Sequence, residues 1–516
     1  MSARIPARWR KAIAPTIGVG LGLAALGGAA VGMAQPPPAP LAGATPMQDQ
    51  PQSQPPPQAE PAVTPQVALH PEEIALLERT LAEAEAHGFE HGAFMPAGLD
   101  GLLRSPDPAA RRSGQTQLVA AVLQYAKAVH AGRLDPGDFL HDWGLHPPPY
   151  DPAPDFVQAE QQGRLGPWLD SLPPPYTGYD ALRRGLAVYR GIAERGGWQR
   201  MAAGDELKLG MKGPRVAPLR ARLAVEDPTV TAGGSVFDAA LAQAVTRAQK
   251  RYGLEPTGTL NNQTLAALNV PVGERVEQII VNMERWRWLP RELPADRVQV
   301  NIAAAVLTVF HDETPVLSMR AVTGRPGDET PMLSSVISSV VLNPPWNVPS
   351  DIAQKELWPK ERAHPGYLAR NEFVVIHTPD GGVRLQQKAG DKSALGHVKF
   401  DFPNIYSVYM HDTPSHGAFA SYGRMVSHGC VRLERPVVLA NLVMQGDAKW
   451  TPDQIDQTIA SGDTVRAPLP KPISVFLLYW TAFASADGQV VSFRSDPYDW
   501  DRDLLQRIDA ATDAVT

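Results

Sequence analysis

The spacing of apolar residues changes near Arg297, and this change limits the choice of fold more than any other feature of the sequence. Upstream, apolar residues recur at steps of three and four, as on the buried face of an amphipathic helix. Downstream, Val298, Val300 and Ile302 alternate with polar residues, as in a half-buried strand. A unit built only of helices, or only of strands, cannot account for both spacings of apolar residues. The sequence therefore predicts an α+β multidomain protein, with helical units first and a mainly β unit over residues 297–470.

Composition narrows the class of protein further. A chain of 516 residues corresponds to about three domains at roughly 150 residues each. Its net charge of -6 lacks the basic footprint of a nucleic-acid binder, so no nucleic-acid partner is expected. With a single cysteine, the chain cannot form an intramolecular disulfide or a multi-cysteine metal cage.

The first 34 residues have the pattern of an export signal. A basic head that ends at Lys11 is followed by an uncharged stretch, residues 12–34, which closes on small or flexible residues. Two interpretations remain open: a signal peptide cleaved after Ala34, or an uncleaved anchor in the inner membrane. Both place the rest of the chain outside the cytoplasm.

Residues 35–68 form a Pro/Gln-rich linker. Such a segment favours extended polyproline II and cannot bury a core. It could hold a folded domain away from a membrane, and a passive tail is equally compatible with the sequence.

Two helical units are expected after the linker. Residues 69–204 carry no chemical motif and are interpreted as a helical scaffold, with proline clusters in its loops. Residues 205–270 predict a compact three-helix unit without His or Cys, which favours binding over catalysis. Residues 271–296 would form a helix that returns to the scaffold. The predicted helices cover residues 71–86, 118–129, 181–194, 216–223, 237–252 and 262–268.

The β unit contains one long excursion and is followed by an extension. Residues 350–400 begin with a helix near 352–358, and excursions of this length inside a compact domain are often lids. Residues 471–516 are expected to pack on the β unit or on the scaffold.

The residues best suited to catalysis lie in the sequence Ser427-His428-Gly429-Cys430. A thiol is a strong nucleophile only as the thiolate, and a nearby imidazole promotes that form. His411 lies at the end of a predicted strand, and the loop 415–425 can return the chain so that Cys430 lies beside it. An unpaired cysteine in an exported protein also suggests a reactive thiol.

The neighbouring residues support this interpretation but leave alternatives. Gly429 allows a tight turn in which nearby amides can face an oxyanion. Cys430 could instead be a small buried residue, and His428 either a structural or a supporting residue. A zinc site from His411, His428 and Cys430 is chemically feasible but has an uncommon spacing. The remaining candidates, expected to be structural or at the surface, are His377, His397 and His416.

The segment from His411 to Cys430 resembles the signature of L,D-transpeptidases with a YkuD-type catalytic domain. The layout of residues 209–268 resembles the type 1 peptidoglycan-binding domain. Further segments are similar to the large, YcbB-type members of the family, namely 284–290, 324–331, 343–349, 394–404 and 479–482.

This resemblance implies both an architecture and an activity. It implies a helical scaffold domain, an inserted peptidoglycan-binding domain, and a β-rich catalytic domain with a capping loop. The implied protein is a periplasmic enzyme without a cofactor or metal that cross-links peptidoglycan. Its implied partners are the stem peptides and glycan of peptidoglycan, and carbapenem-type inhibitors are expected to acylate its cysteine.

The resemblance also implies a role for each site residue. The Cys430 thiolate would attack the residue-3 carbonyl of a donor tetrapeptide and release D-Ala, with His411 as general base and acid. The backbone carbonyl of Asp412 would orient His411, while His428 and Gly429 would lie at the oxyanion. Substrate-binding roles are implied for Ser427, Tyr409 and Arg432.

Several alternatives stay open at this stage. Arg432 could form an ion pair with Glu434 instead of binding a substrate carboxylate. The same thioester chemistry would serve an L,D-carboxypeptidase, or an enzyme that attaches a protein to the wall. A non-catalytic wall-binding scaffold is the third alternative.

Overall fold

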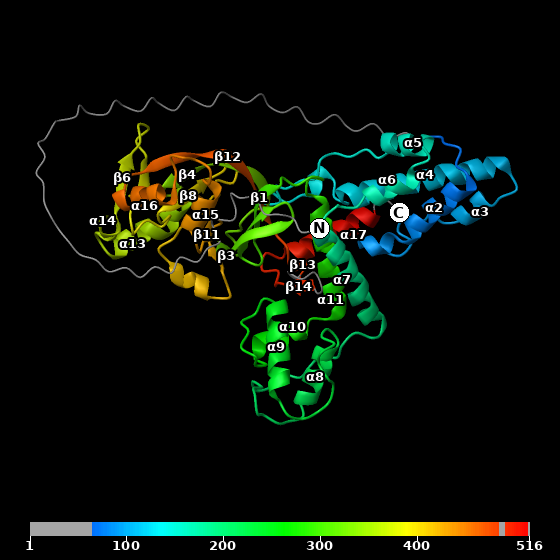
Figure 1. Ribbon diagram of the computed structural model, residues 1–516, viewed down its shortest axis with the longest axis horizontal. Coiled ribbons are helices and arrows are strands. Elements are labelled where there is room, and N and C mark those ends of the chain that lie inside the picture. Colours follow the sequence, from blue (N-terminus) through cyan, green and yellow to red (C-terminus); the bar gives the residue numbers. More distant parts are fainter. Residues whose placement is uncertain (1–63, 485–490, 514–516) are drawn as a thin grey trace, which may run out of the picture.

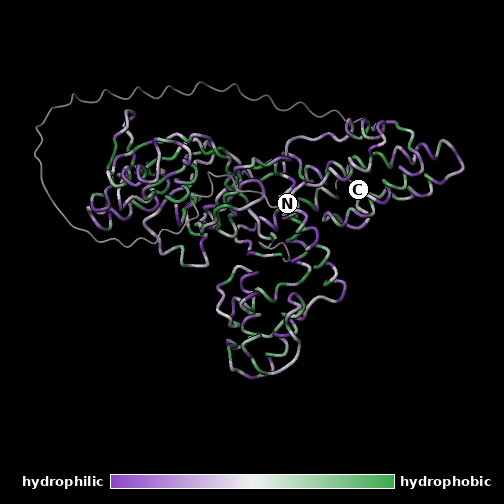
Figure 2. Tube along the Cα trace, in the orientation of Figure 1, coloured by the Kyte–Doolittle hydropathy of each residue, from purple (hydrophilic) through white to green (hydrophobic). Residues whose placement is uncertain are grey.

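The computed structural model describes residues 64–484 and 491–513 (Figure 1). The expected export signal and nearly all of the expected linker lie outside these residues. Within the described residues, no helix is long and apolar enough to cross a membrane. Hydrophobic and hydrophilic segments are interspersed throughout the folded part of the chain, as Figure 2 shows.

A helical scaffold forms one end of the molecule (Figure 1). Its longest helix starts at Pro108, where the Asp107 side chain accepts a hydrogen bond from the Ala109 amide, and it ends at Gly132 with φ 93°. This helix is longer than predicted, because its first turns are mostly exposed and carry no apolar stripe. The scaffold helices are α2 Pro71–Ala82, the 3₁₀ helix Ala84–His87, α3 Leu99–Leu103, α4 Pro108–Ala131, the 3₁₀ helix Pro136–Asp138, α5 Ala153–Gln161, α6 Leu165–Ser171 and α7 Thr177–Glu194.

A three-helix unit is inserted between α7 and the helix that returns to the scaffold. The returning helix, α11 Val272–Arg287, packs along α7, so the two helices form a stalk that leads to the inserted unit (Figure 1). The inserted helices are α8 Val216–Ala224, α9 Ala239–Arg251 and α10 Asn262–Leu268. Polar caps start two of them, since Asp238 accepts from the Leu241 amide and Asn261 accepts from the Thr264 amide.

A buried ionic cluster ties α11 to the scaffold. Glu284 is fully buried, 3.2 Å from the Arg133 guanidinium and 2.6 Å from that of Arg287. Arg287 also donates a hydrogen bond to the Tyr179 hydroxyl on α7. Burial alone would raise the pKa of Glu284, but the two arginines outweigh it and hold the pKa below its usual value.

The β unit is built on one sheet with the strand order β10-β3-β11-β9-β8-β4-β12-β1-β2, and the additional pairing of β2 with β3 closes it. Helices α15 Pro436–Val443 and α16 Pro452–Ser461 pack against it. The strands are β1 Asp296–Asn301, β2 Val306–His311, β3 Thr314–Gly324, β4 Leu333–Leu342, β8 Val398–Asp401, β9 Met410–His411, β10 Met425–Ser427, β11 Val431–Leu433 and β12 Val465–Leu478.

The sheet continues beyond residue 470, where the sequence had suggested a boundary. β12 pairs antiparallel with β4 and parallel with β1, so residues up to Leu478 belong to the sheet. The rest of the extension packs against the stalk helices. It consists of β13 Ala482–Ala484, β14 Val491–Phe493 and α17 Trp500–Asp513.

The excursion forms a separate small cap. The predicted helix near 352–358 is present but longer, and a hairpin that was not predicted follows it. A compact apolar cluster that includes Leu357, Leu368 and Leu385 holds the cap together. Its elements are β5 Trp346–Asn347, α12 Ser350–Ile352, the π-helix Ala353–Leu357, α13 Trp358–Ala363, α14 Tyr367–Arg370, β6 Phe373–His377 and β7 Val383–Gln387.

Candidate active site

The cysteine and the histidine singled out in the sequence lie on the same face of two adjacent parallel strands. The register pairs Val431 of β11 with Met410 of β9, and Arg432 with His411. Val431 and Met410 are fully buried in the core. Because side chains alternate along a strand, the opposite face of this pair of strands carries Tyr409, His411, Cys430 and Arg432.

His411 is oriented by the backbone of its neighbour. Its Nδ1 lies 2.5 Å from the carbonyl oxygen of Asp412. A carbonyl can only accept, so Nδ1 carries the proton and Nε2 keeps its lone pair. Burial, aided by the charge of Arg432, lowers the pKa of His411 to about 3, whereas the carbonyls of Asp412 and Leu395 act in the opposite direction. The imidazole is therefore neutral near pH 7.

Cys430 is half-buried, and burial raises the pKa of its thiol. Hydrogen bonds from the backbone and the hydroxyl of Tyr409 oppose this effect, as do the positive charges of Lys399 and Arg432. At rest the site is thus a neutral thiol beside a neutral imidazole, with donors placed to receive a thiolate.

Lys399 is a site residue that the sequence analysis did not assign. It lies directly opposite His411 in the antiparallel pairing of β8 with β9. Its ammonium lies 4.3 Å from the centre of the Tyr409 ring. The sequence did contain a signal, because Lys399 stands between Val398 and Phe400, which are fully buried, and so faces the other side of the strand.

The turn before Cys430 is held by its own hydrogen bonds. The hydroxyl of Ser427 donates to the Cys430 carbonyl at 2.6 Å and accepts from the Gly429 amide at 3.2 Å. Thr330 donates to the Gly429 carbonyl at 2.7 Å. Gly429 has φ 99°, which favours glycine. Ser427 is only 1% exposed, so it shapes the turn rather than facing a substrate.

These hydrogen bonds determine which backbone amides are left to bind the expected oxyanion. The Gly429 amide is engaged by Ser427, whereas no hydrogen bond within residues 64–484 and 491–513 uses the amide of Cys430. The Cys430 amide is therefore a free backbone donor of this turn within those residues, and no hydrogen bond there uses the His428 amide either.

His428 contacts the cap. Its Nε2 lies 2.6 Å from a carboxylate oxygen of Glu356, in the π-helix of the cap. The same carboxylate lies 3.6 Å from Lys360 and 3.9 Å from Arg325. Burial would raise the pKa of Glu356, but the hydrogen bond from His428 and the charges around it hold the pKa below its usual value. Glu356 could not be predicted from the sequence, because nothing local links a cap residue to this turn.

Arg432 does not pair with Glu434. Glu434 instead binds Arg320, whose Nε lies 2.9 Å from its carboxylate. Burial lowers the pKa of Arg432, and no acid within the described ranges forms an ion pair with it. Its guanidinium is therefore available to an external carboxylate.

The three other candidate histidines have partners of their own or are exposed. His397 contacts Asn343 and Asp391, each at 3.1 Å, and His377 and His416 are exposed. In the part of the chain that the structure describes, no group of three or more His, Cys, Asp or Glu residues is arranged to hold a metal ion.

The domains are matched by three family profiles. Residues 295–456 match the YkuD family, described as "L,D-transpeptidase catalytic domain", and residues 69–186 match "Scaffold domain". Residues 212–268 match "Putative peptidoglycan binding domain".

A curated protein is also similar in sequence to part of the chain. The chain is 32% identical over 244 residues to the "Putative L,D-transpeptidase" of Haemophilus influenzae, a match that covers 44% of this chain and 49% of that protein. The chain thus spans about half the length of this curated relative.

Two solved structures are also similar to part of the chain. The L,D-transpeptidase from Mycobacterium smegmatis is 18% identical, with 36% of this chain and 58% of that chain covered and a TM-score of 0.18. L,D-transpeptidase 3 from Mycobacterium tuberculosis, in complex with a faropenem-derived adduct, is 18% identical, with 36% and 60% covered and a TM-score of 0.19. The assignment of the domains rests on the family profiles and the sequence relative. The chain carries an L,D-transpeptidase catalytic domain of the YkuD type, together with a scaffold domain and a peptidoglycan-binding domain.

Proposed function

We propose that the protein is a peptidoglycan L,D-transpeptidase that acts in the periplasm and needs no cofactor. The observation that carries this proposal is the shared face of β9 and β11, where Cys430 and the oriented imidazole of His411 lie together. The peptidoglycan-binding domain supports peptidoglycan as the substrate. The expected export signal supports a site outside the cytoplasm.

The first half of the reaction forms a thioester. Nε2 of His411 takes the thiol proton as the sulfur of Cys430 attacks the third-residue carbonyl of a donor tetrapeptide, normally diaminopimelate. The Cys430 amide donates to the oxyanion, and His428 and Gly429 border it. When the tetrahedral intermediate collapses, the peptide C–N bond breaks, and His411 returns the proton to the departing amine of D-Ala.

The second half transfers the acyl group. An amine of a second stem peptide attacks the thioester and loses its proton to His411. The C–S bond then breaks, the new amide cross-links the two stems, and the proton returns to the thiol. Tyr409 and Lys399 stabilise the developing thiolate in both halves. Arg432 binds a substrate carboxylate, and the cap limits the access of water that would hydrolyse the thioester.

Mass spectrometry of muropeptides tests this proposal. Purified protein incubated with disaccharide tetrapeptide should yield a cross-linked dimer with loss of one D-Ala, and Cys430→Ala should yield none. Tripeptide without dimer would indicate an L,D-carboxypeptidase instead. Dimer formation by Cys430→Ala at the wild-type rate would refute the assigned nucleophile and leave a wall-binding role.

Acylation by a carbapenem is a second test, because attack of the thiolate on a strained β-lactam carbonyl uses the same machinery. Intact-mass analysis after exposure to meropenem should show one adduct on the wild-type protein and none on Cys430→Ala. An unchanged wild-type mass would contradict the proposal.

A further inference from the structure

A groove of about 790 Å³ lies where the peptidoglycan-binding unit meets the catalytic domain. One wall comes from α9 and α10, including Lys250, and from Tyr252, which follows α9; Arg275 of α11 lies beside it. The opposite wall comes from residues 303–306 and 422–426 of the catalytic domain, and residues 493–497 close the groove. In Figure 1, α9 and α10 lie below β14, with β3 above them to the left.

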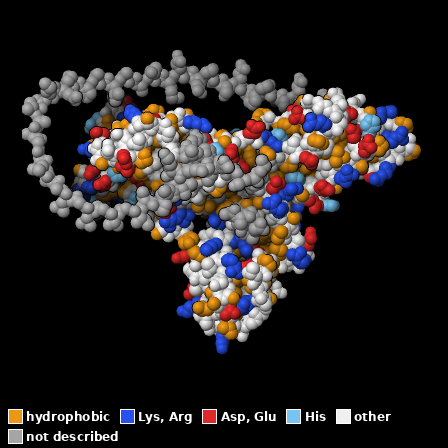
Figure 3. All heavy atoms as spheres, viewed as in Figure 1, with side chains coloured by type: hydrophobic (Ala, Val, Ile, Leu, Met, Phe, Trp, Pro, Cys, Tyr) orange, Lys and Arg blue, Asp and Glu red, His pale blue; other side chains and the backbone are white. Residues whose placement is uncertain are grey.

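All charged side chains that line the groove are cationic. They are Lys250, Arg275, Arg424 and Arg494, and no aspartate or glutamate lies among its lining residues, all of which the structure describes. Lys and Arg side chains also border this junction at the surface in Figure 3. The four cations gather in one groove although the net charge of the chain is -6.

The protein itself does not neutralise these cations. The guanidinium of Arg424 donates to the carbonyls of Ser421 and Ala304 at 3.0 and 3.1 Å. That of Arg494 donates to the carbonyl of Arg251 at 3.2 Å. Within the described ranges, no carboxylate forms an ion pair with either of them. Burial, followed by the charge of Arg424, lowers the pKa of Arg494 to about 10. An anionic ligand would offset the positive charge of these two guanidinium groups.

The groove also presents apolar surface. Tyr422 is 49% exposed and Val426 is 50% exposed, although both are large hydrophobic residues. Cations beside exposed apolar side chains suit a ligand that carries carboxylates on a partly apolar peptide backbone.

The groove lies close to the catalytic turn along the chain. Val426 lies in β10, which pairs with the end of β3, and Cys430 follows four residues later. Four extended residues span at most about 13 Å. A peptide held in the groove is therefore within one short stem of the thiol. No cap residue lines the groove, so it forms an approach separate from the contact of His428 with Glu356.

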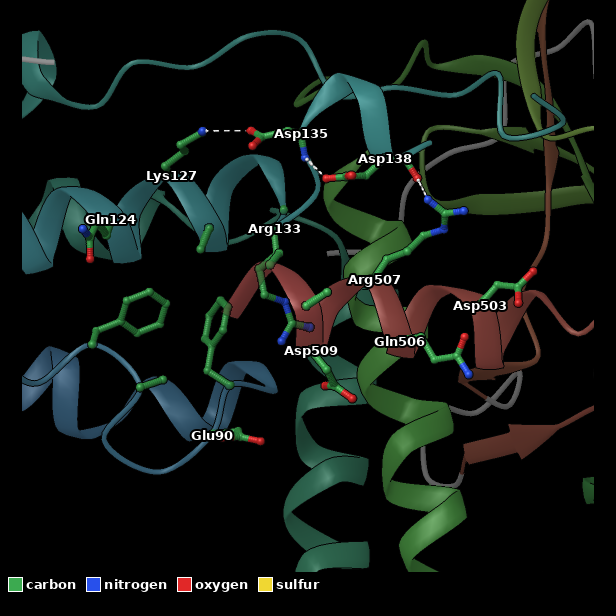
Figure 4. A pocket seen from close by; sticks show the side chains of 17 residues that line it. Glu90, Gln124, Lys127, Arg133, Asp135, Asp138, Asp503, Gln506, Arg507 and Asp509 are labelled. Carbon is green, nitrogen blue, oxygen red and sulfur yellow. Dashed lines mark hydrogen bonds and ion pairs between the residues drawn. The ribbon is translucent and has the colours of Figure 1, made fainter. Parts of the chain in front are cut away.

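A second cavity, of about 740 Å³ between the scaffold and α17, differs in character (Figure 4). It contains its own acids, and Lys127 is already paired with Asp135 at 3.4 Å. The cationic groove differs from this cavity because every charged side chain that lines it is cationic.

We propose that the cationic groove binds the carboxylates of the acceptor stem peptide and brings its amine to the thioester on Cys430. This inference rests on the proposed transpeptidase function. The donor stem would bind on the cap side of the turn, so that the two stems reach the sulfur by separate routes.

Charge reversal at Lys250 tests the groove in the full-length protein. Lys250 is exposed and lines the groove, and Lys212 is an exposed lysine of the same unit outside it. With disaccharide tetrapeptide as substrate, Lys250→Glu should lower the ratio of cross-linked dimer to hydrolysed tripeptide about tenfold, a change that corresponds to one lost charge contact. Lys212→Glu should keep the wild-type ratio. A wild-type ratio in Lys250→Glu would overturn the proposal.

Two further measurements separate this inference from the function on which it rests. Lys250→Glu could lower the rate of acylation by meropenem and the rate of dimer formation by the same factor. In that case the groove serves the donor, and the acceptor assignment is overturned. If the wild-type protein forms no acyl-enzyme, the proposed function fails. The groove is then tested by titrating Cys430→Ala with the tetrapeptide muropeptide and with its carboxyl-amidated form. Weaker binding of the amidated form than of the unmodified form would support the groove. Weaker binding of the muropeptide after Lys250→Glu is added to Cys430→Ala would support it as well. Equal binding in these comparisons would overturn it.

Discussion

At the scale of the residue, the site combines a cysteine that resists ionisation with a histidine that resists protonation. Burial raises the pKa of Cys430 and lowers that of His411 to about 3, so a resting thiolate–imidazolium pair is disfavoured. Proton transfer must therefore accompany attack on the substrate. Tyr409, Lys399 and Arg432 then face the negative charge that develops on sulfur.

The first prediction concerns the reactivity of the thiol with pH. Because the pKa of Cys430 is raised, its rate of alkylation by iodoacetamide should be low at pH 7 and keep rising above the ordinary thiol value of about 8.5. The rate is measured by intact mass against the free cysteine of an unfolded control. A plateau below pH 7 would show that a stable thiolate exists at rest.

The second prediction concerns Tyr409. Tyr409→Phe keeps the ring under Lys399 but removes the hydroxyl that donates to sulfur, so acylation by meropenem should slow about tenfold. The alkylation profile should also shift to higher pH. Tyr422→Phe serves as the matched control, since Tyr422 lies in the cationic groove rather than beside Cys430. An unchanged alkylation profile in Tyr409→Phe would rule out this role.

At the scale of the element, the cap is tied to the catalytic turn by the carboxylate of Glu356. Its partners His428 and Arg325 belong to the catalytic domain, whereas Lys360 belongs to the cap itself. Because the folded-state pKa of Glu356 is depressed, the contact contributes stability above the ordinary glutamate value of about 4.3. That contribution is lost as the pH falls through the lowered value.

The third prediction follows from this contact. Glu356→Gln should increase hydrogen exchange over residues 350–363 at pH 7, after correction for intrinsic rates. Wild-type exchange should approach that of the variant as the pH falls through the lowered pKa of Glu356. Lys355→Gln, at an exposed neighbouring position, should leave exchange unchanged. Equal protection in wild type and Glu356→Gln at pH 7 would show that the carboxylate does not hold the cap.

At the scale of the whole molecule, the catalytic domain and the peptidoglycan-binding unit are positioned by the stalk of α7 and α11. The buried Glu284 joins this stalk to Arg133 of the scaffold. Removing one partner leaves uncompensated buried charge, which is strongly destabilising even where the intact pair contributes little.

The fourth prediction concerns this junction. Glu284→Gln should lower the free energy of unfolding by about 3–5 kcal/mol, because Arg133 and Arg287 would remain buried without their carboxylate. Urea unfolding followed by tryptophan fluorescence measures the change. Glu277→Gln, at an exposed position of the same helix, should change the stability by less than about 0.5 kcal/mol. A similar small change in Glu284→Gln would indicate that the cluster does not stabilise the junction.

The sequence alone determined those features that depend on short-range patterns and on chemical identity. Apolar spacing located α7, α9 and α10, and the change of period near Arg297 marked the start of the sheet. Cys430 was identifiable because it is the only thiol in the chain. The tertiary structure decided what depends on residues far apart in the chain: the place of β12 inside the sheet, the contact of Glu356 with His428, and the gathering of four cations in one groove. No local period encodes such contacts, because they arise only when segments more than fifty residues apart pack together.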